Sequence, residues 1–99
     1  MAKSIYKVFM GRKLDAWYRL SPKEQQSIES RLVEALKKVG AKRLVVCDST
    51  WSSDQWQFAG VEEFPNIEAV QEYMAAVNEL GVFRYVESTS VLGTRLELG

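Results

Sequence analysis

Polar side chains that could carry out acid–base chemistry lie on strand faces that the sequence predicts to be apolar. Asp48 shares such a face with Val46, and Glu87 shares one with Tyr85. A carboxylate in apolar surroundings can acquire a raised pKa and then accept or donate a proton. Arg84 and Tyr85 together offer guanidinium and phenol donors for a carboxylate or enolate oxygen. Asp48, Arg84, Tyr85 and Glu87 are therefore the candidate catalytic residues.

Lys7 is a further charge of this kind, because it lies between Ile5 and Phe9 in the first predicted strand. The alternative for all these side chains is a solvated position at an edge or rim of the sheet, since charged residues are mostly exposed in proteins. For Arg84 the alternative is a surface position at the start of a strand. The sequence leaves these alternatives open.

Four aromatic residues in predicted loops or at strand ends are candidates for ligand binding. Trp17 and Tyr18 precede a helix and could form the wall or lid of a pocket, or could instead close one end of the fold by packing. Trp51 lies in a polar turn and Trp56 begins the next predicted strand. Either could stack on a planar ligand or anchor a protein interface, where tryptophan is enriched.

Composition excludes several classes of function. The chain has no histidine and one cysteine, Cys47. Histidine is the commonest transition-metal ligand, and a single cysteine cannot form an intrachain disulfide. The acidic residues lack the spacing of a calcium loop, and the glycines are too scattered to form a phosphate-binding loop. We therefore predict no metal and no cofactor.

Charge and length limit the partners and the domain organisation. Thirteen Lys and Arg balance thirteen Asp and Glu, so no net charge attracts nucleic acid or an anionic membrane. With 46% hydrophobic and 26% charged residues, the chain has the composition of a globular protein, and its length predicts one domain over residues 1–99. Neither a membrane-spanning run nor a signal-type run occurs, which predicts a cytoplasmic protein.

The order of elements comes from hydrophobic periodicity and from residues typical of helix ends. Ser21 begins a helix as its cap, Glu24 completes a capping box, and Gly40 ends that helix. Asn66 and Gly81 mark the two ends of a second helix in the same way. Period-two alternation marks the strands. The predicted order is strand 4–11, helix 22–39, strand 43–48, strand 55–64, helix 67–80 and strand 82–93.

This βαββαβ order predicts an α+β, ferredoxin-like fold. Right-handed crossovers place both helices on one face of a four-stranded antiparallel sheet, so the other face is uncovered. No predicted strand has a face made only of charged residues, and an exposed apolar patch of this kind is rare in monomers. We therefore expect a homodimer formed by sheet-to-sheet packing.

Three stretches carry a resemblance to a known superfamily. Residues 16–24 contain the pattern Ala-Trp-x-x-Leu-Ser-x-x-Glu, residues 58–70 read FAGVEEFPNIEAV, and residues 81–85 enter the last strand. In these features the chain resembles the dimeric α+β barrel superfamily, and more narrowly a small bacterial family that carries the first pattern and has no assigned chemistry. The resemblance implies a dimeric α+β barrel similar to the antibiotic-biosynthesis monooxygenases.

Relatives in that superfamily include cofactor-free monooxygenases, muconolactone isomerases, polyketide cyclases, haem-degrading enzymes and chlorite dismutases. Haem ligation and acid–base chemistry in many of them depend on histidine, which this chain lacks. The resemblance therefore implies a cofactor-free monooxygenase, isomerase or cyclase acting on a small aromatic or polyketide-like compound. The alternative is a non-catalytic binding or assembly module. A cavity of a few hundred cubic ångströms, lined by a buried carboxylate or an arginine, would favour the enzyme.

Overall fold

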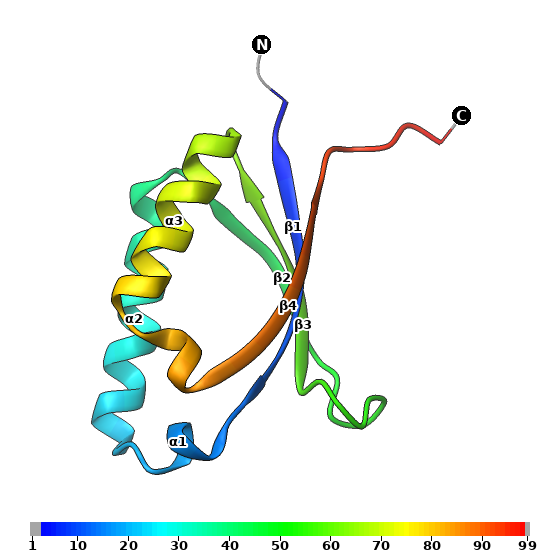
Figure 1. Ribbon diagram of the computed structural model, residues 1–99. Coiled ribbons are helices and arrows are strands. Elements are labelled where there is room, and N and C mark those ends of the chain that lie inside the picture. The colour runs from blue at the N-terminus through cyan, green and yellow to red at the C-terminus, as the bar shows by residue number, and fades with distance from the viewer. Residues whose placement is uncertain (1–2, 99) are drawn as a thin grey trace.

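The computed structural model describes residues 3–98 and has the predicted α+β, ferredoxin-like fold (Figure 1). Both long helices lie on one face of an antiparallel four-stranded sheet, whose strand order is β2-β3-β1-β4. No helix in the described part of the chain is long and apolar enough to span a membrane. The elements are β1 (Ile5–Lys13), α1 (Asp15–Tyr18), α2 (Pro22–Lys38), β2 (Lys42–Asp48), β3 (Phe58–Phe64), α3 (Ile67–Glu79), the 3₁₀ turn η1 (Val82–Arg84) and β4 (Val86–Gly93).

The helix ends follow from local hydrogen bonding. The Ser21 hydroxyl accepts a hydrogen bond from the backbone N–H of Glu24, and the Glu24 carboxylate accepts one from the backbone N–H of Ser21. The Asn66 side chain caps α3 by accepting from the backbone N–H of Ala69. These bonds satisfy N–H groups that have no partner inside a helix. The two predicted helix starts are therefore confirmed.

Two predicted strand boundaries are wrong. Strand β3 begins at Phe58 rather than at residue 55, because the backbone of Trp56 is bound within its own loop: its carbonyl accepts from the Ser49 hydroxyl and its N–H donates to the Ser53 hydroxyl. Residues 82–84 form a 3₁₀ turn instead of strand, since Gly81 has a φ of 69° and its carbonyl accepts from the backbone N–H of Arg84.

The sheet register divides the strand residues between two faces. On the outer face, away from the helices, paired residues form a row of four valines, Val45, Val61, Val8 and Val91. Side chains alternate along a strand, so Lys7 and Phe9, which flank Val8, point to the inner face. Lys7 thus shares a strand face with Phe9, as its alternation in the first predicted strand indicates.

The core lies between the inner face and the helices, at the end of the molecule where β3 meets α3. Phe64 is fully buried and its ring contacts Tyr73 at 5.6 Å between centroids. The other buried members of this cluster are Leu36 of α2, Ala41, Val82 of η1, and Ala69, Val70 and Val77 of α3. Packing is therefore dense at one end of the layer, and the opposite end, near α1 and η1, encloses free space.

The outer face is uncovered along its whole apolar centre. Val8 is 46% exposed and Val91 is 64% exposed. A contiguous apolar surface on one side of a sheet is typical of a protein interface.

Candidate functional site

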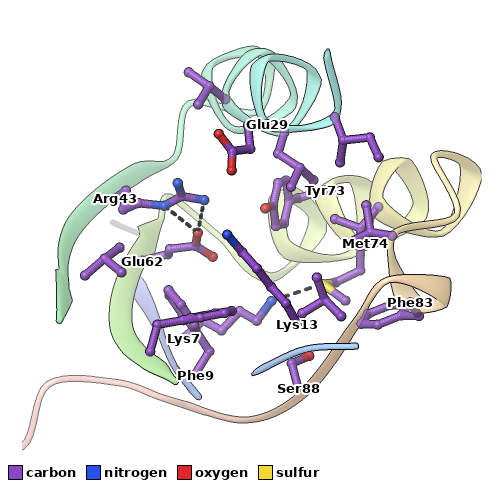
Figure 2. A pocket seen from close by; sticks show the side chains of 18 of the residues that line it. Lys7, Phe9, Lys13, Glu29, Arg43, Glu62, Tyr73, Met74, Phe83 and Ser88 are labelled. Atoms are coloured by element: carbon purple, nitrogen blue, oxygen red, sulfur yellow. Dashed lines mark hydrogen bonds and ion pairs between the residues drawn. The ribbon is translucent and has the colours of Figure 1, made fainter. Parts of the chain in front are cut away.

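A cavity of about 370 Å³ lies between the inner face of the sheet and the helices α2 and α3 (Figure 2). Most of its wall is aliphatic or aromatic, which is typical of sites for small organic molecules. The wall comes from every layer of the fold: Phe9, Lys13, Phe58, Val46 and Val86 from the sheet, Trp17 from α1, Ile28 and Leu32 from α2, Tyr73 and Met74 from α3, and Phe83 from η1.

Two glycines in the strands leave room for the aromatic floor of this cavity. A Cβ atom on Gly60 would lie 2.6 Å from the Phe9 ring and 2.5 Å from the Val45 carbonyl oxygen, and one on Gly11 would lie 2.4 Å from the Phe58 ring. The two phenyl rings meet edge to face with centroids 6.3 Å apart. Glycine at these positions therefore lets both rings lie close over the sheet.

Three charged residues form one row across the inner face. Arg43 of β2 pairs in register with Glu62 of β3, which pairs with Lys7 of β1. Residues paired in this way project from the same face, so their side chains are neighbours. Figure 2 shows all three at one end of the cavity, with the Tyr73 ring above them. We refer to Lys7, Arg43, Glu62 and Tyr73 as the polar cluster.

Glu62 is the most deeply buried charged residue in the described part of the chain, at 2% exposed. Its Oε2 atom accepts hydrogen bonds from Nε and Nη2 of Arg43, at 3.2 and 3.1 Å. A carboxylate at this depth needs such a partner, because an isolated charge in an apolar interior is very costly. The arginine therefore neutralises Glu62 and brings a second cation to the cavity wall.

Lys7 has an environment unusual for an amine. Its Nζ atom donates a hydrogen bond of 3.2 Å to the Met74 sulfur and lies 5.5 Å from the centroid of the Tyr73 ring. Burial lowers the pKa of Lys7 from its usual value; the charge of Glu62 opposes this shift and that of Arg43 adds to it. Lys7 therefore releases its proton more readily than an exposed lysine.

Tyr73 is shifted in the opposite sense. Burial raises the pKa of its phenol to about 12, and the negative charge of Glu62 contributes in the same direction. The ring thus remains a protonated hydrogen-bond donor throughout the ordinary pH range.

This shift predicts a loss of stability in alkali. The unfolded chain releases the Tyr73 proton near pH 10 and the folded protein near pH 12, so the phenol contributes stability below pH 10 that is lost as the pH rises to 12. We expect the free energy of unfolding, measured by urea denaturation, to fall by about 2 kcal/mol over this interval through Tyr73. Tyr73→Phe should remove that part of the decrease, and Tyr18→Phe, at an exposed position, should not. Equal pH dependence in wild type and Tyr73→Phe would contradict the shift.

Trp17 forms the wall at the other end of the cavity. It is 4% exposed, although it belongs to the four-residue helix α1. The Lys13 ammonium lies 4.8 Å from the centroid of the indole, a distance at which the ring attracts a cation. Trp17, a candidate ligand-binding residue, thus lines the cavity, and its side chain is at the same time buried by packing.

The predicted catalytic residues lie elsewhere. Asp48 ends β2 in an exposed position, where its carboxylate accepts hydrogen bonds from the hydroxyl and backbone N–H of Thr50, and these bonds lower the pKa of Asp48. Glu87 forms an exposed ion pair with Arg12 across β1 and β4. Both carboxylates therefore lie in solvated positions, which is the alternative that the sequence left open for charged residues on the strands.

Arg84 is exposed on η1, and Tyr85 follows it at the start of β4, where its backbone carbonyl accepts from the N–H of Leu14. The structure does not bring these two residues to the cavity wall. Among the remaining aromatic candidates, Tyr18 is 62% and Trp51 is 83% exposed, and Trp56 is partly buried in the loop that precedes β3.

Three members of the polar cluster, Arg43, Glu62 and Tyr73, were not among the sequence candidates, whereas Lys7 was considered as a charge on an apolar strand face. For Lys7 and Glu62 the signal was present, because each alternates with apolar residues along a predicted strand, as Asp48 does. The pairing that joins them to Arg43 depends on register, and β2 carries an irregularity between Arg43 and Val45 that shifts the alternation of that strand. Tyr73 belongs to the apolar stripe of its helix and gave no separate signal.

Comparison with known proteins supports the fold. No protein-family model and no curated protein matches the chain. Among solved structures, it is similar to chlorite dismutase from Candidatus Nitrospira defluvii in complex with imidazole, with a TM-score of 0.74 and 19% identity over 95% of this chain. It is also similar to a protein of unknown function from Rhodopseudomonas palustris, with a TM-score of 0.66 and 14% identity over 99% of this chain.

The two similar structures differ in how much of their own length this chain covers. The chain spans 41% of the chlorite dismutase chain and 86% of the Rhodopseudomonas palustris chain. The likeness shows the fold, which is the α+β, ferredoxin-like fold.

Proposed function

We propose that this protein is a cofactor-independent enzyme of the monooxygenase, isomerase or cyclase type, and that it acts on a small aromatic or polyketide-like compound bound in the cavity. One observation carries the proposal: a charged cluster that contains a buried carboxylate and an arginine lines one end of a cavity of about 370 Å³ whose wall is mostly apolar, with Lys13, Glu29 and Ser88 as its other polar residues. This is the feature that separates an enzyme from a filled assembly module, because a filled module would have no such space.

In this proposal the apolar walls hold the planar part of the substrate and the polar cluster handles a proton. Lys7 accepts a proton from an acidic O–H or C–H group, since its lowered pKa makes the neutral amine more accessible. The resulting anion lies near the Lys7 ammonium and the Arg43 guanidinium, which stabilise it in surroundings that exclude water. In the monooxygenase version, the substrate anion itself supplies the electron to dioxygen.

Haem does not fit the donors of this cavity. The superfamily includes haem enzymes, but the chain has no histidine. Cysteine, methionine and tyrosine are the other protein ligands of haem iron. Cys47 pairs in register with Ala59 on the outer face, the Met74 sulfur accepts a hydrogen bond from Lys7, and the raised pKa of Tyr73 keeps its phenol protonated. Haem therefore has no part in the proposed reaction.

We further propose that the protein acts as a homodimer whose sheets pack face to face. The row of valines on the outer face supports this arrangement, since Val8 is 46% and Val91 is 64% exposed. Packing of this face against a second copy would bury the apolar centre of both sheets and leave both cavities on the far sides.

A phenol whose ionised form absorbs visible light tests the proposed proton transfer. We expect para-nitrophenol to bind one site per chain and to shift toward the phenolate on binding, because Lys7 takes up the proton and Arg43 stabilises the anion. Lys7→Met should weaken the binding of the phenolate by about tenfold or more, which corresponds to ~1.4 kcal/mol. The matched control Lys37→Met, at an exposed position on α2, should behave as wild type. Absence of binding, or binding without a change in ionisation, would overturn the proposal.

A further inference from the structure

Among the described residues, no carboxylate forms a hydrogen bond or an ion pair with the Lys7 amine, which lies in the cavity. In the described residues the closest hydrogen-bond acceptor recorded for Nζ is the Met74 sulfur at 3.2 Å, and a thioether is a weak acceptor. The carboxylate beside it in the register, Glu62, is engaged by two nitrogens of Arg43. Figure 2 shows the Lys7 side chain extending toward Met74, between the sheet and α3.

This arrangement differs from that of a lysine held for structural reasons. A structural ammonium would be paired with a carboxylate or left in water, as Arg12 is with Glu87 on the outer face. Lys7 instead faces a mostly apolar cavity, with Arg43 as a second cation in the same row and with Glu29 and Lys13 elsewhere on the cavity wall. Desolvation and a neighbouring cation are the two features that activate a lysine as a nucleophile toward carbonyl groups.

We infer that Lys7 forms a Schiff base with a small conjugated aldehyde or ketone bound in the cavity. The inference rests on the proposed function and names the substrate class more narrowly, as carbonyl compounds. The aromatic side chains Phe9 and Phe58, packed edge to face, line the cavity and offer an aromatic surface for a conjugated group. Lys7 lies two residues before Phe9 on the same inner face of the sheet.

The step balances without an oxidant or reductant. The nitrogen lone pair of the neutral amine attacks the carbonyl carbon, forming a carbon–nitrogen bond while the carbon–oxygen π bond breaks. The carbonyl oxygen then leaves as water and carries away the two hydrogens of the amine. The imine formed in this way is neutral, and its nitrogen then takes up a proton from solvent water. The protonated imine withdraws electrons from the adjacent carbon, so the C–H group on that carbon becomes acidic. An isomerase or cyclase uses this kind of proton loss.

Trapping with a reducing agent tests the inference. Wild-type protein is treated with salicylaldehyde and sodium borohydride, which reduces an imine to a stable secondary amine. We expect one adduct per chain, with the mass of one probe molecule less one oxygen atom, and peptide mapping should place it on Lys7. Lys7→Met should lose the adduct and Lys37→Met should retain it. Lys13→Met should also retain the adduct. This variant separates the two lysines of the cavity, because Lys13 lines the same space as Lys7.

The outcomes separate this inference from the proposed function. Binding of para-nitrophenol without an adduct on Lys7 overturns the Schiff base and leaves the proposed function standing. An adduct on Lys13, or adducts spread equally over surface lysines in wild type and Lys7→Met, also overturns it. Because mapping is done on the wild-type protein, the result does not depend on how well a variant folds. If the wild-type protein neither binds para-nitrophenol nor forms the adduct, both proposals are overturned.

Discussion

Arg43→Met is expected to lower the free energy of unfolding by about 3 kcal/mol or more, because it leaves the Glu62 carboxylate charged and unpartnered inside the protein. Glu62 is 2% exposed and both of its recorded side-chain hydrogen bonds come from Arg43. Removing the guanidinium therefore leaves the full cost of burying the carboxylate. This loss of stability lies at the lower end of the range known for broken buried ion pairs, because the Arg43 side chain itself is 38% exposed.

A double-mutant cycle separates the pairing from the loss of arginine packing. Adding Glu62→Met to Arg43→Met should restore most of the lost stability, because a hydrophobic pair of similar volume needs no compensation for charge. The chain also provides a matched control in its exposed ion pair: Arg12→Met, which removes the partner of Glu87, should cost at most about 1 kcal/mol. Urea denaturation measures the wild type, the single variants Arg43→Met and Glu62→Met, the double variant and the control Arg12→Met. Equal, small losses for Arg43→Met and Arg12→Met would contradict the burial of the cluster.

Val8→Glu is expected to dissociate the proposed homodimer. Val8 lies in the row of valines on the outer face and is 46% exposed in the single chain. In a two-fold interface each substitution places two carboxylates in the contact, and each loses water without gaining a partner. We expect the dissociation constant to rise by about a thousandfold or more, equivalent to ~4 kcal/mol.

Sedimentation equilibrium over a range of concentrations measures this effect. Ile67→Glu is the control, because Ile67 is exposed to a similar extent, 43%, but belongs to α3 on the opposite side of the sheet. That variant should remain a dimer. A wild-type monomer at every concentration, or a Val8→Glu dimer as stable as the wild type, would contradict sheet-to-sheet packing.

The sequence predicted the elements well because local signals mark their ends. The capping box at Ser21, the Asn66 cap and the two helix-ending glycines are interactions between near neighbours. The boundary of β3 was missed because Ser49 and Ser53 bind the backbone of Trp56 through a loop conformation that residue patterns do not reveal.

The candidate site was less accessible from sequence. Trp17 was recognised from its position before a helix, and the structure places it at the cavity. The polar cluster joins residues from β1, β2, β3 and α3 that only sheet register and helix docking bring together. Asp48 and Glu87 had the same alternation as Lys7, but each lies where solvent and a local partner are available. Sequence alternation alone does not distinguish a central strand position from an exposed one.

The central claim is that a small aromatic compound binds between the sheet and the helices. Methyl NMR tests it directly, because Met74 lines the cavity and Met10 lies on the outer face of β1. The two methyl signals are assigned with Met74→Leu and Met10→Leu and then followed during titration with para-nitrophenol. We predict that the Met74 signal shifts with saturation at one site per chain, while the Met10 signal stays in place. A saturable shift of Met10 with an unchanged Met74 would place the ligand on the outer face and contradict the account.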